Sequence, residues 1–186
     1  MPVRTALRMT EPEREAPWSR ALTEGDPAAF DALVRETRSA LGTFLRRLCP
    51  SAHDAEDIVQ ETYLKVYEHR RRYDGRSSVK TWMYAIALNL LRDRGRRRGP
   101  LPLQDQGVQM PVDRRLEKAE LADRIRALVQ SLPDGQREVF TLYRYEGIPY
   151  EEIARMLGIT VGAVKAQMHH AIAKIRSGLE PLGYLP

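Results

Sequence analysis

The sequence RRRYDGRSSVKTWMYAIALNLLRDRGRRR, residues 70–98, decides how the rest of the chain is interpreted. A basic loop leads into a helix that is predicted to start at Ser77 and Ser78, because serine accepts hydrogen bonds from the free amides of a first helical turn. Apolar residues at helical spacing predict a buried stripe made of Val79, Trp82, Met83, Ile86 and Leu90. The stripe leaves other faces of the helix to Lys80, Thr81, Tyr84, Asn89 and Asp93.

The polar faces of this stretch admit two interpretations. Arginines beside Tyr73, Trp82 and Tyr84 offer cations for phosphates and aromatic faces for unstacked bases, as a site for single-stranded nucleic acid requires. The Asn89 amide adds a group that can bind a base edge. An ordinary amphipathic helix with a solvated basic end explains the same residues, so the stretch alone favours neither interpretation.

Composition narrows the class of protein. The chain has 186 residues, 42% of them hydrophobic, which suffices for one or two small helical domains. A net charge of +5 and a pI of about 9.5 favour an anionic partner. Cys49 is the single cysteine, which excludes a disulfide within the chain and fits a reducing, cytoplasmic setting. No apolar run is long enough for a membrane span, and residues 1–18 lack the apolar core of a signal peptide, so no membrane insertion is expected.

The N-terminal half predicts a polar leader followed by packed helices. Residues 1–17 are expected to be a flexible leader, because they are rich in charge and proline. Asp26 with Pro27 predicts the start of a helix, which continues along an apolar stripe until Pro50 stops it.

An acidic helix is predicted to follow, with Ser51 as its N-cap and Asp54 in the position of a capping box. Its first turns concentrate carboxylates, which suit the helix dipole in part. In a basic protein this face would also repel DNA and attract a basic protein surface. Asp57 and Glu61, one turn apart, suggest metal ligands as a further alternative, but no histidine or third acid completes such a site.

The C-terminal half is separated from the first by residues 99–115, whose prolines and glycines predict a linker. Helical periodicity resumes at Leu116. A short helix over 150–157, a turn at Gly158 and an N-cap at Thr160 then predict a helix-turn-helix, whose second helix would enter the major groove of duplex DNA. The expected fold is therefore all-α, with two small helical domains joined by a flexible linker.

Taken together, these motifs resemble an extracytoplasmic-function (ECF) sigma factor of bacterial RNA polymerase. The resemblance rests on DAEDIVQETYLKVYE (54–68), YDGRSSVKTWMYAIALNLLRDRGRRR (73–98) and YEEIARMLGITVGAVKAQ (150–167), in this order and across a linker. It implies a region 2 domain over 18–98, which docks on core polymerase and melts the −10 element. It implies a region 4 domain over 116–180, which reads the −35 element.

The resemblance also assigns roles to residues. Core polymerase would meet Asp54, Asp57, Val59, Gln60, Glu61 and Leu64. The opened −10 strand would be surrounded by Tyr73, Lys80, Thr81, Trp82, Tyr84, Asn89 and Arg92. Along the recognition helix would lie Lys165, Gln167, His169 and His170. This helix has fewer arginines than is common in the family, so its phosphate contacts should be weaker or depend on protonation of the two histidines.

The implied partners are core RNA polymerase, through the clamp and flap regions, and promoter DNA. An anti-sigma factor is a further partner implied by the resemblance alone. No cofactor, metal site or enzymatic activity is expected, because the sequence lacks a nucleophile with its base, a metal cluster and a phosphate-binding glycine loop. The alternatives from other classes are a stand-alone DNA-binding regulator and a metal-dependent nuclease that uses the acids between Asp54 and Glu61.

Overall fold

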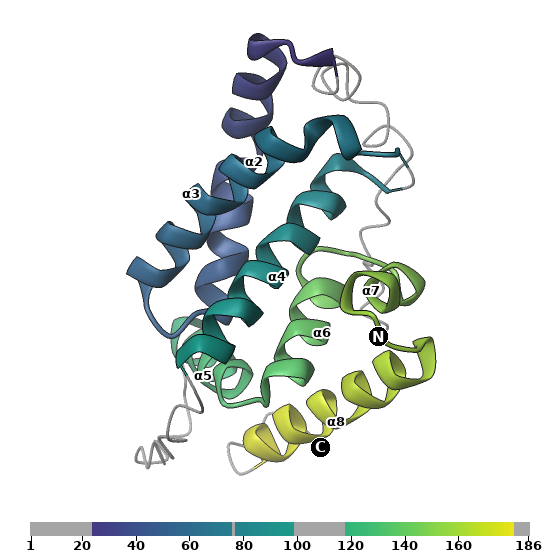
Figure 1. Cartoon of the computed structure of the whole chain (residues 1–186). Coiled ribbons are helices and arrows are strands. Elements are labelled where there is room, and N and C mark those ends of the chain that lie inside the picture. Colours follow the sequence, from purple (N-terminus) through teal and green to yellow (C-terminus); the bar gives the residue numbers. More distant parts are fainter. Residues whose placement is uncertain (1–23, 76, 99–117, 181–186) are drawn as a thin grey trace.

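A computed structural model of the chain describes residues 24–75, 77–98 and 118–180. The predicted leader, 1–17, and the predicted linker, 99–115, lie outside these residues. The helices follow one another in the order α2 (Pro27–Leu48), α3 (Ala52–His69), the 3-10 turn η2 (Arg70–Arg72), α4 (Val79–Arg98), α5 (Lys118–Gln130), α6 (Asp134–Arg144), α7 (Tyr150–Leu157) and α8 (Val161–Leu179) (Figure 1). The predicted all-α fold is confirmed.

The starts of the helices follow the capping residues in the sequence. Asp26 accepts a hydrogen bond from the Ala28 amide at 2.9 Å, and Ser51 accepts one from the Asp54 amide at 3.1 Å. Thr160 caps α8 in the same way. Each cap contributes about 1 kcal/mol to helix stability. α7 begins after Pro149, which supplies no side-chain cap.

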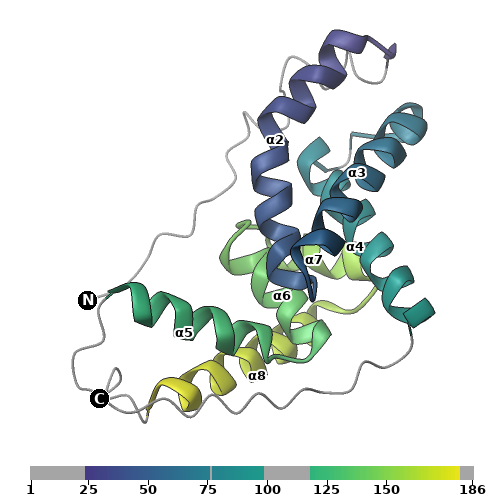
Figure 2. The same cartoon turned by 90° about the vertical axis from the view of Figure 1, so that its left-hand side faces the viewer.

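Helices α2, α3 and α4 form the N-terminal helical unit. They pack lengthwise, with α3 and α4 on one side of α2 (Figures 1 and 2). The large side chains at their centre are fully buried and include Leu33, Leu41, Phe44, Leu45, Ile58, Met83 and Leu88. This packing holds the acidic helix α3 and the basic helix α4 in one rigid group.

Helices α5 to α8 form the C-terminal helical unit, in which α5 and α6 support the predicted helix-turn-helix of α7 and α8. Gly158 ends α7 with φ of 66°, a left-handed conformation that suits glycine. The Ile159 amide then donates to the Ala154 carbonyl at 3.0 Å, which closes the turn. Ile153 and Val164 are fully buried and fix the angle between the two helices.

Replacing Gly158 by alanine should lower stability, because the left-handed conformation costs an L-residue about 1–2 kcal/mol. We expect the melting temperature to fall by about 2–4 °C for each kcal/mol lost. Gly95→Ala is the matched control, since Gly95 lies in α4 and a methyl group added there would meet nothing within 4 Å. Thermal unfolding should show a gain for the control, because alanine favours helix by about 1 kcal/mol over glycine. Equal melting temperatures for both variants would contradict this account of the turn.

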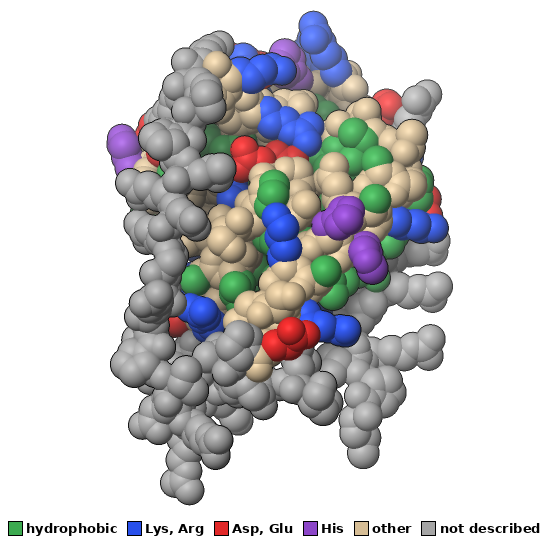
Figure 3. All heavy atoms as spheres, turned by 90° about the horizontal axis from the view of Figure 1, so that it is seen from below, with side chains coloured by type: hydrophobic (Ala, Val, Ile, Leu, Met, Phe, Trp, Pro, Cys, Tyr) green, Lys and Arg blue, Asp and Glu red, His purple; other side chains and the backbone are tan. Residues whose placement is uncertain are grey.

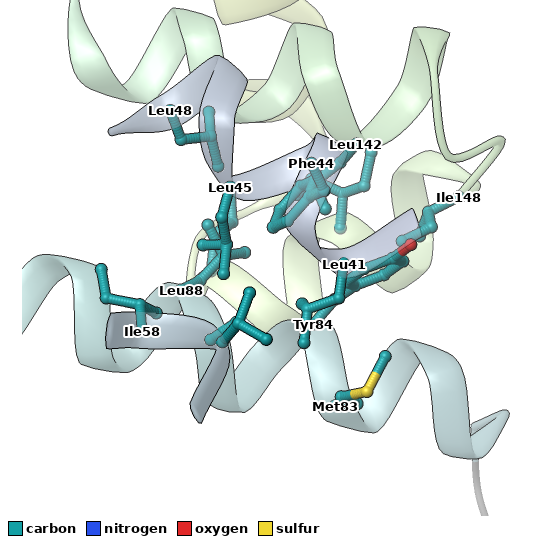
Figure 4. Packing of buried hydrophobic residues seen from close by; sticks show 14 of the residues in the cluster. Leu41, Phe44, Leu45, Leu48, Ile58, Met83, Tyr84, Leu88, Leu142 and Ile148 are labelled. Atoms are coloured by element: carbon teal, nitrogen blue, oxygen red, sulfur yellow. The ribbon is translucent and has the colours of Figure 1, made fainter. Parts of the chain in front are cut away.

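The two helical units share one continuous core. Figure 4 shows Phe44 and Tyr84 of the N-terminal unit beside Leu142 and Ile148 of the C-terminal unit. The Phe44 and Tyr84 rings lie 4.6 Å apart between centroids. Burial of apolar surface contributes about 25 cal/mol per Å², so this contact stabilises the packed arrangement of the two units. Periodicity within each half could not predict it.

Candidate functional site

The acidic face of α3 is paired with a basic side chain of α4. One Arg94 nitrogen lies 3.4 Å from Asp57 and another lies 3.0 Å from Glu61. The side chains of both acids remain about two-fifths exposed, at 42% and 39%. Asp54 accepts a hydrogen bond from the Ser51 hydroxyl at 2.8 Å and belongs to the helix cap. The face therefore stays open to a partner, with Arg94 holding two of its carboxylates in place.

Two apolar residues that the resemblance assigned to polymerase contact differ sharply in exposure. Leu64 is 65% exposed, which is unusual for leucine and suits a docking surface. Val59 is only 7% exposed and lies in the core. Its side chain packs among the core residues of the helices, so it does not form part of the exposed face of α3. Gln60 is exposed beside the acids.

Helix α4 buries more of its surface than the apolar stripe predicts. Met83 and Val79 are buried as expected, but Thr81 and Tyr84 are buried too, at 2% and 0% exposure. The placement of these two on open faces is thus wrong for this conformation. Thr81 shares a hydrogen bond with Ser78 in the first turn, at 3.0 Å. Tyr84 is covered because the C-terminal unit packs over it.

The remaining predicted −10 residues of α4 are accessible to different degrees. Asn89 is exposed, and Lys80 and Arg92 are partly exposed. Trp82 is half-buried and packs against the core.

Tyr73 is anchored rather than free in its loop. Its ring lies 5.4 Å from the Trp82 ring between centroids, and its hydroxyl donates a hydrogen bond to the Ser77 carbonyl. The side chain is half-buried against the core. Tyr73 therefore also contributes to the packing of the loop against α4. Its position still places an aromatic ring at the entrance to α4.

A glutamate of the C-terminal unit lies at the centre of a basic and aromatic cluster. The Tyr84 hydroxyl donates to Glu146 Oε2 at 2.6 Å. Arg47 and Lys80 lie 3.8 and 3.9 Å from the same carboxylate, whose side chain is 7% exposed. Burial, together with the adjacent carboxylate, raises the pKa of Tyr84 far above its usual range. The hydroxyl is therefore a permanent hydrogen-bond donor in this arrangement.

A second glutamate pairs with the basic end of α4. Arg92 donates to both oxygens of Glu138, at 3.2 and 2.5 Å. The Glu138 side chain is only 6% exposed. Such two-point pairs between a guanidinium and a carboxylate are among the stronger polar contacts in proteins. The sequence analysis assigned a function to neither glutamate. The signal that could have pointed to Glu138 is its position four residues before Leu142, which puts an acid on the apolar face of the helix.

The residues of the recognition helix α8 that were predicted to lie along DNA differ in exposure. Lys165, His169 and His170 are exposed. Gln167 is half-buried. Its amide oxygen lies 3.1 Å from the position that a Cβ atom on residue 135 would take if Gly135 had a side chain. That oxygen is enclosed and has no hydrogen-bond partner among the described residues. Gln167 therefore packs on the start of α6 in this conformation.

The face of the molecule that contains α8 is modestly basic. Figure 3 shows a pair of histidines on this face, with lysine and arginine side chains spread around them rather than gathered in one patch. This agrees with the low arginine content of the helix in the sequence.

The described part of the chain contains no candidate metal-ion cluster and no candidate membrane-spanning helix. There, no three His, Cys, Asp or Glu side chains are grouped to hold a metal ion. Within the same residues, no helix combines the length and apolar character needed to cross a membrane.

Comparison with known families finds two matches in chain order. Residues 33–100 match Sigma-70 region 2, and residues 122–175 match Sigma-70, region 4. The first match covers the acidic helix and the basic helix, and the second covers the helix-turn-helix.

Curated relatives match over most of the chain. RNA polymerase sigma-H factor of Pseudomonas aeruginosa is 32% identical over 180 residues, which cover 85% of this chain and 90% of the relative. ECF RNA polymerase sigma-E factor of Escherichia coli K12 is 29% identical over 174 residues, with 86% and 91% covered.

Solved structures match over both helical units. The structure of CnrH in complex with the cytosolic domain of CnrY has a TM-score of 0.68 at 25% identity and covers 91% of this chain and 97% of CnrH. Bartonella quintana RpoE, solved with the anti-sigma factor NepR, has a TM-score of 0.66 at 24% identity, with 81% and 96% covered, and shares the fold.

Proposed function

We propose a role for each surface of this chain on the basis of its family. The chain belongs to the sigma-70 family of bacterial RNA polymerase sigma factors, in the ECF branch. As a member, it directs core polymerase to specific promoters at the start of transcription. The observation that carries this function is the succession of region 2 and region 4 along one chain. We assign region 2 to residues 18–98, the linker to 99–115 and region 4 to 116–180.

The exposed face of α3 is the surface proposed to dock on the polymerase clamp. Asp57 and Glu61 supply negative charge, and Leu64 supplies an exposed apolar side chain in the next turn. Complementary charge orients the two proteins and speeds their association, and an apolar centre of the interface adds affinity. The clamp surface is accordingly expected to be basic around an apolar pocket.

Helix α4 and the loop before it are proposed to hold the opened −10 strand. Asn89 is exposed and available to a base edge, while Tyr73 and Trp82 supply rings at the start of the helix. Lys80 and Arg92 supply charge for phosphates. Thr81 and Tyr84 are buried in this conformation. Access of DNA to Tyr84 requires the C-terminal unit, whose Glu146 accepts the Tyr84 hydrogen bond, to move away.

Helix α8 is proposed to read the −35 element in the major groove. Lys165 lies exposed in its second turn, where helix-turn-helix proteins contact base edges. His169 and His170, also exposed, are placed one turn further along.

Lys165→Ala should weaken binding to a −35 duplex more than Gln167→Ala does, because Lys165 is exposed and Gln167 packs on Gly135. A lost contact to a base edge costs about 1–3 kcal/mol, so we expect a loss of roughly tenfold for Lys165→Ala. Fluorescence anisotropy with duplexes selected from a promoter library measures both variants. Selection of an altered −35 sequence by Gln167→Ala but not by Lys165→Ala would reverse the assignment.

The remaining proposals concern partners and setting. Both structural neighbours were solved with a protein partner, and RpoE's is an anti-sigma factor. We propose that an antagonist of this kind also binds this chain, and that the chain acts in the cytoplasm with the polymerase. We propose further that it has no catalytic activity of its own.

Three assays separate this function from its alternatives. A sigma factor should co-elute with core polymerase, whereas a stand-alone regulator should bind duplex DNA without it. A metal-dependent nuclease should cleave DNA when magnesium is added. Co-elution without cleavage is the expected result, and cleavage lost on Asp57→Asn would instead favour the nuclease.

A further inference from the structure

The turn η2 carries two unpaired cations at the entrance to the proposed −10 site. Arg71 and Arg72 are exposed and form no ion pair or side-chain hydrogen bond with the residues that the structure describes. The next residue, Tyr73, packs its ring against Trp82, with the two centroids 5.4 Å apart. Two free positive charges therefore lie beside the aromatic pair that is proposed to hold unstacked bases.

Arg70, the first arginine of the turn, has a different part, because its side chain fixes the backbone. Its guanidinium lies 4.1 Å from the centroid of the Tyr67 ring, and one of its nitrogens donates to the Tyr67 carbonyl at 2.5 Å. The Tyr73 amide donates to the Arg70 carbonyl at 3.3 Å, which closes the turn. Since both ends of the turn are held, Arg71 and Arg72 project into solvent from a defined position.

The basic side chains of α4 are in a different state from these two. Those that the structure describes are all paired with carboxylates of the chain: Lys80 with Glu146, Arg92 with Glu138, Arg94 with Asp57 and Glu61, and Arg96 with Asp93. Each of them has to exchange one charged partner for another before it can bind a phosphate. Arg71 and Arg72 have no such partner to give up.

The position of the turn leaves it open to nucleic acid. Figures 1 and 2 show the end of α3 and the start of α4 at the upper end of the molecule, with α5 to α8 below them in both views. The C-terminal unit therefore does not cover the turn. The clamp surface that meets α3 is expected to be basic, so it would repel these arginines, whereas a DNA strand would attract them.

We propose that Arg71 and Arg72 bind phosphates of the opened −10 strand, next to the bases held at Tyr73 and Trp82. A guanidinium suits this contact, because its parallel N–H groups match two phosphate oxygens. The assignment rests on the proposed −10 role of α4 and its loop, and it adds two residues to those that the resemblance gives. Phosphate contacts position a strand without reading its sequence. The pair should therefore raise affinity and salt dependence and leave base preference unchanged.

The test measures strand binding by the holoenzyme, formed from the full chain and core polymerase. One probe is a labelled single strand that carries a −10 sequence selected from a promoter library, and the other is the same strand with that sequence scrambled. The variant is Arg71→Ala/Arg72→Ala. The matched control is Arg35→Ala/Arg38→Ala, which removes two exposed arginines of α2 and changes the net charge equally. Fluorescence anisotropy gives the dissociation constants at several concentrations of KCl.

We expect the logarithm of the affinity to fall less steeply with the logarithm of salt concentration in the variant than in the wild type. The slope should be smaller by about 1.4, which is about 0.7 for each lost phosphate contact to a single strand. The ratio of affinities for the selected and scrambled strands should stay the same. Arg71→Lys/Arg72→Lys should keep the wild-type slope, because lysine binds phosphate as a point charge. The α2 control should keep it too.

Asn89→Ala separates the phosphate contacts from the −10 role itself. It should lower the ratio between the two strands and leave the slope unchanged, because Asn89 is assigned to a base edge. Circular dichroism checks folding, and Arg71→Gln/Arg72→Gln replaces the alanine variant if its helix signal is reduced.

Three results would contradict the phosphate contacts. A wild-type slope in the arginine variant, with the ratio lost in Asn89→Ala, would refute them and leave the −10 role standing. An equal fall of the slope in the α2 control would show a general effect of net charge, and would refute them as well. Wild-type binding by both the arginine variant and Asn89→Ala would overturn the −10 role together with the contacts.

Discussion

Asp57→Lys/Glu61→Lys should lose association with core polymerase by about 100-fold or more. Close charge pairs at protein interfaces are worth about 1.5–7 kcal/mol in measured cases, and this variant replaces attraction by repulsion at two neighbouring positions. Each side chain is about two-fifths exposed, at 42% and 39%, so the fold should be little affected. Co-elution with core polymerase on gel filtration measures the loss.

Two controls separate docking from internal effects. Asp31→Lys/Glu151→Lys changes net charge equally at exposed positions outside α3 and should bind polymerase normally. Arg94→Ala removes the internal partner of both acids and leaves their charge available, so its binding should be retained or improved. Normal co-elution of the doubly reversed protein would disprove the assignment of the α3 face.

Tyr73→Ala and Asn89→Ala holoenzymes should still bind duplex promoter but open it poorly. Stacking of a base on an aromatic ring is worth about 1–3 kcal/mol by alanine substitution, and a base-edge contact contributes a similar amount. We therefore expect open complex to fall by roughly tenfold in each case. Permanganate footprinting of the −10 region measures it.

Tyr73 also has a structural role, so the experiment needs a variant that keeps its ring. Its ring contacts Trp82 and its hydroxyl bonds the Ser77 carbonyl, so alanine also removes packing. Tyr73→Phe keeps the ring, loses only the hydrogen bond, and should open promoters almost normally. A template already mismatched at −10 should rescue Tyr73→Ala more than Asn89→Ala, because only Asn89 is assigned to base readout. Normal opening in both alanine variants would refute a single-strand role for α4.

Local features were predictable from the sequence because their causes are local. The caps at Asp26, Ser51 and Thr160 are bonded within a few residues, and the turn at Gly158 depends on its own φ. The periodicity of apolar residues then gives the helices and the helix-turn-helix.

Exposure on α4 was harder to predict, because it depends on contacts between distant parts of the chain. Tyr84 is polar enough to lie outside, yet Phe44 and Glu146 enclose it from two other segments of the chain. Gln167 is turned inward because Gly135 leaves room for its amide. Periodicity describes one helix at a time, so it cannot show which of its faces a distant segment covers.

Reconstituted transcription tests the central claim that this chain is a promoter-specificity subunit. Core polymerase from the source bacterium is incubated with the chain and a genomic promoter library, and the 5′ ends of the transcripts are sequenced. The account predicts transcripts that require the chain and share one −10 and one −35 sequence upstream of their starts. A folded chain that binds core polymerase but yields only the starts seen with core alone would contradict it.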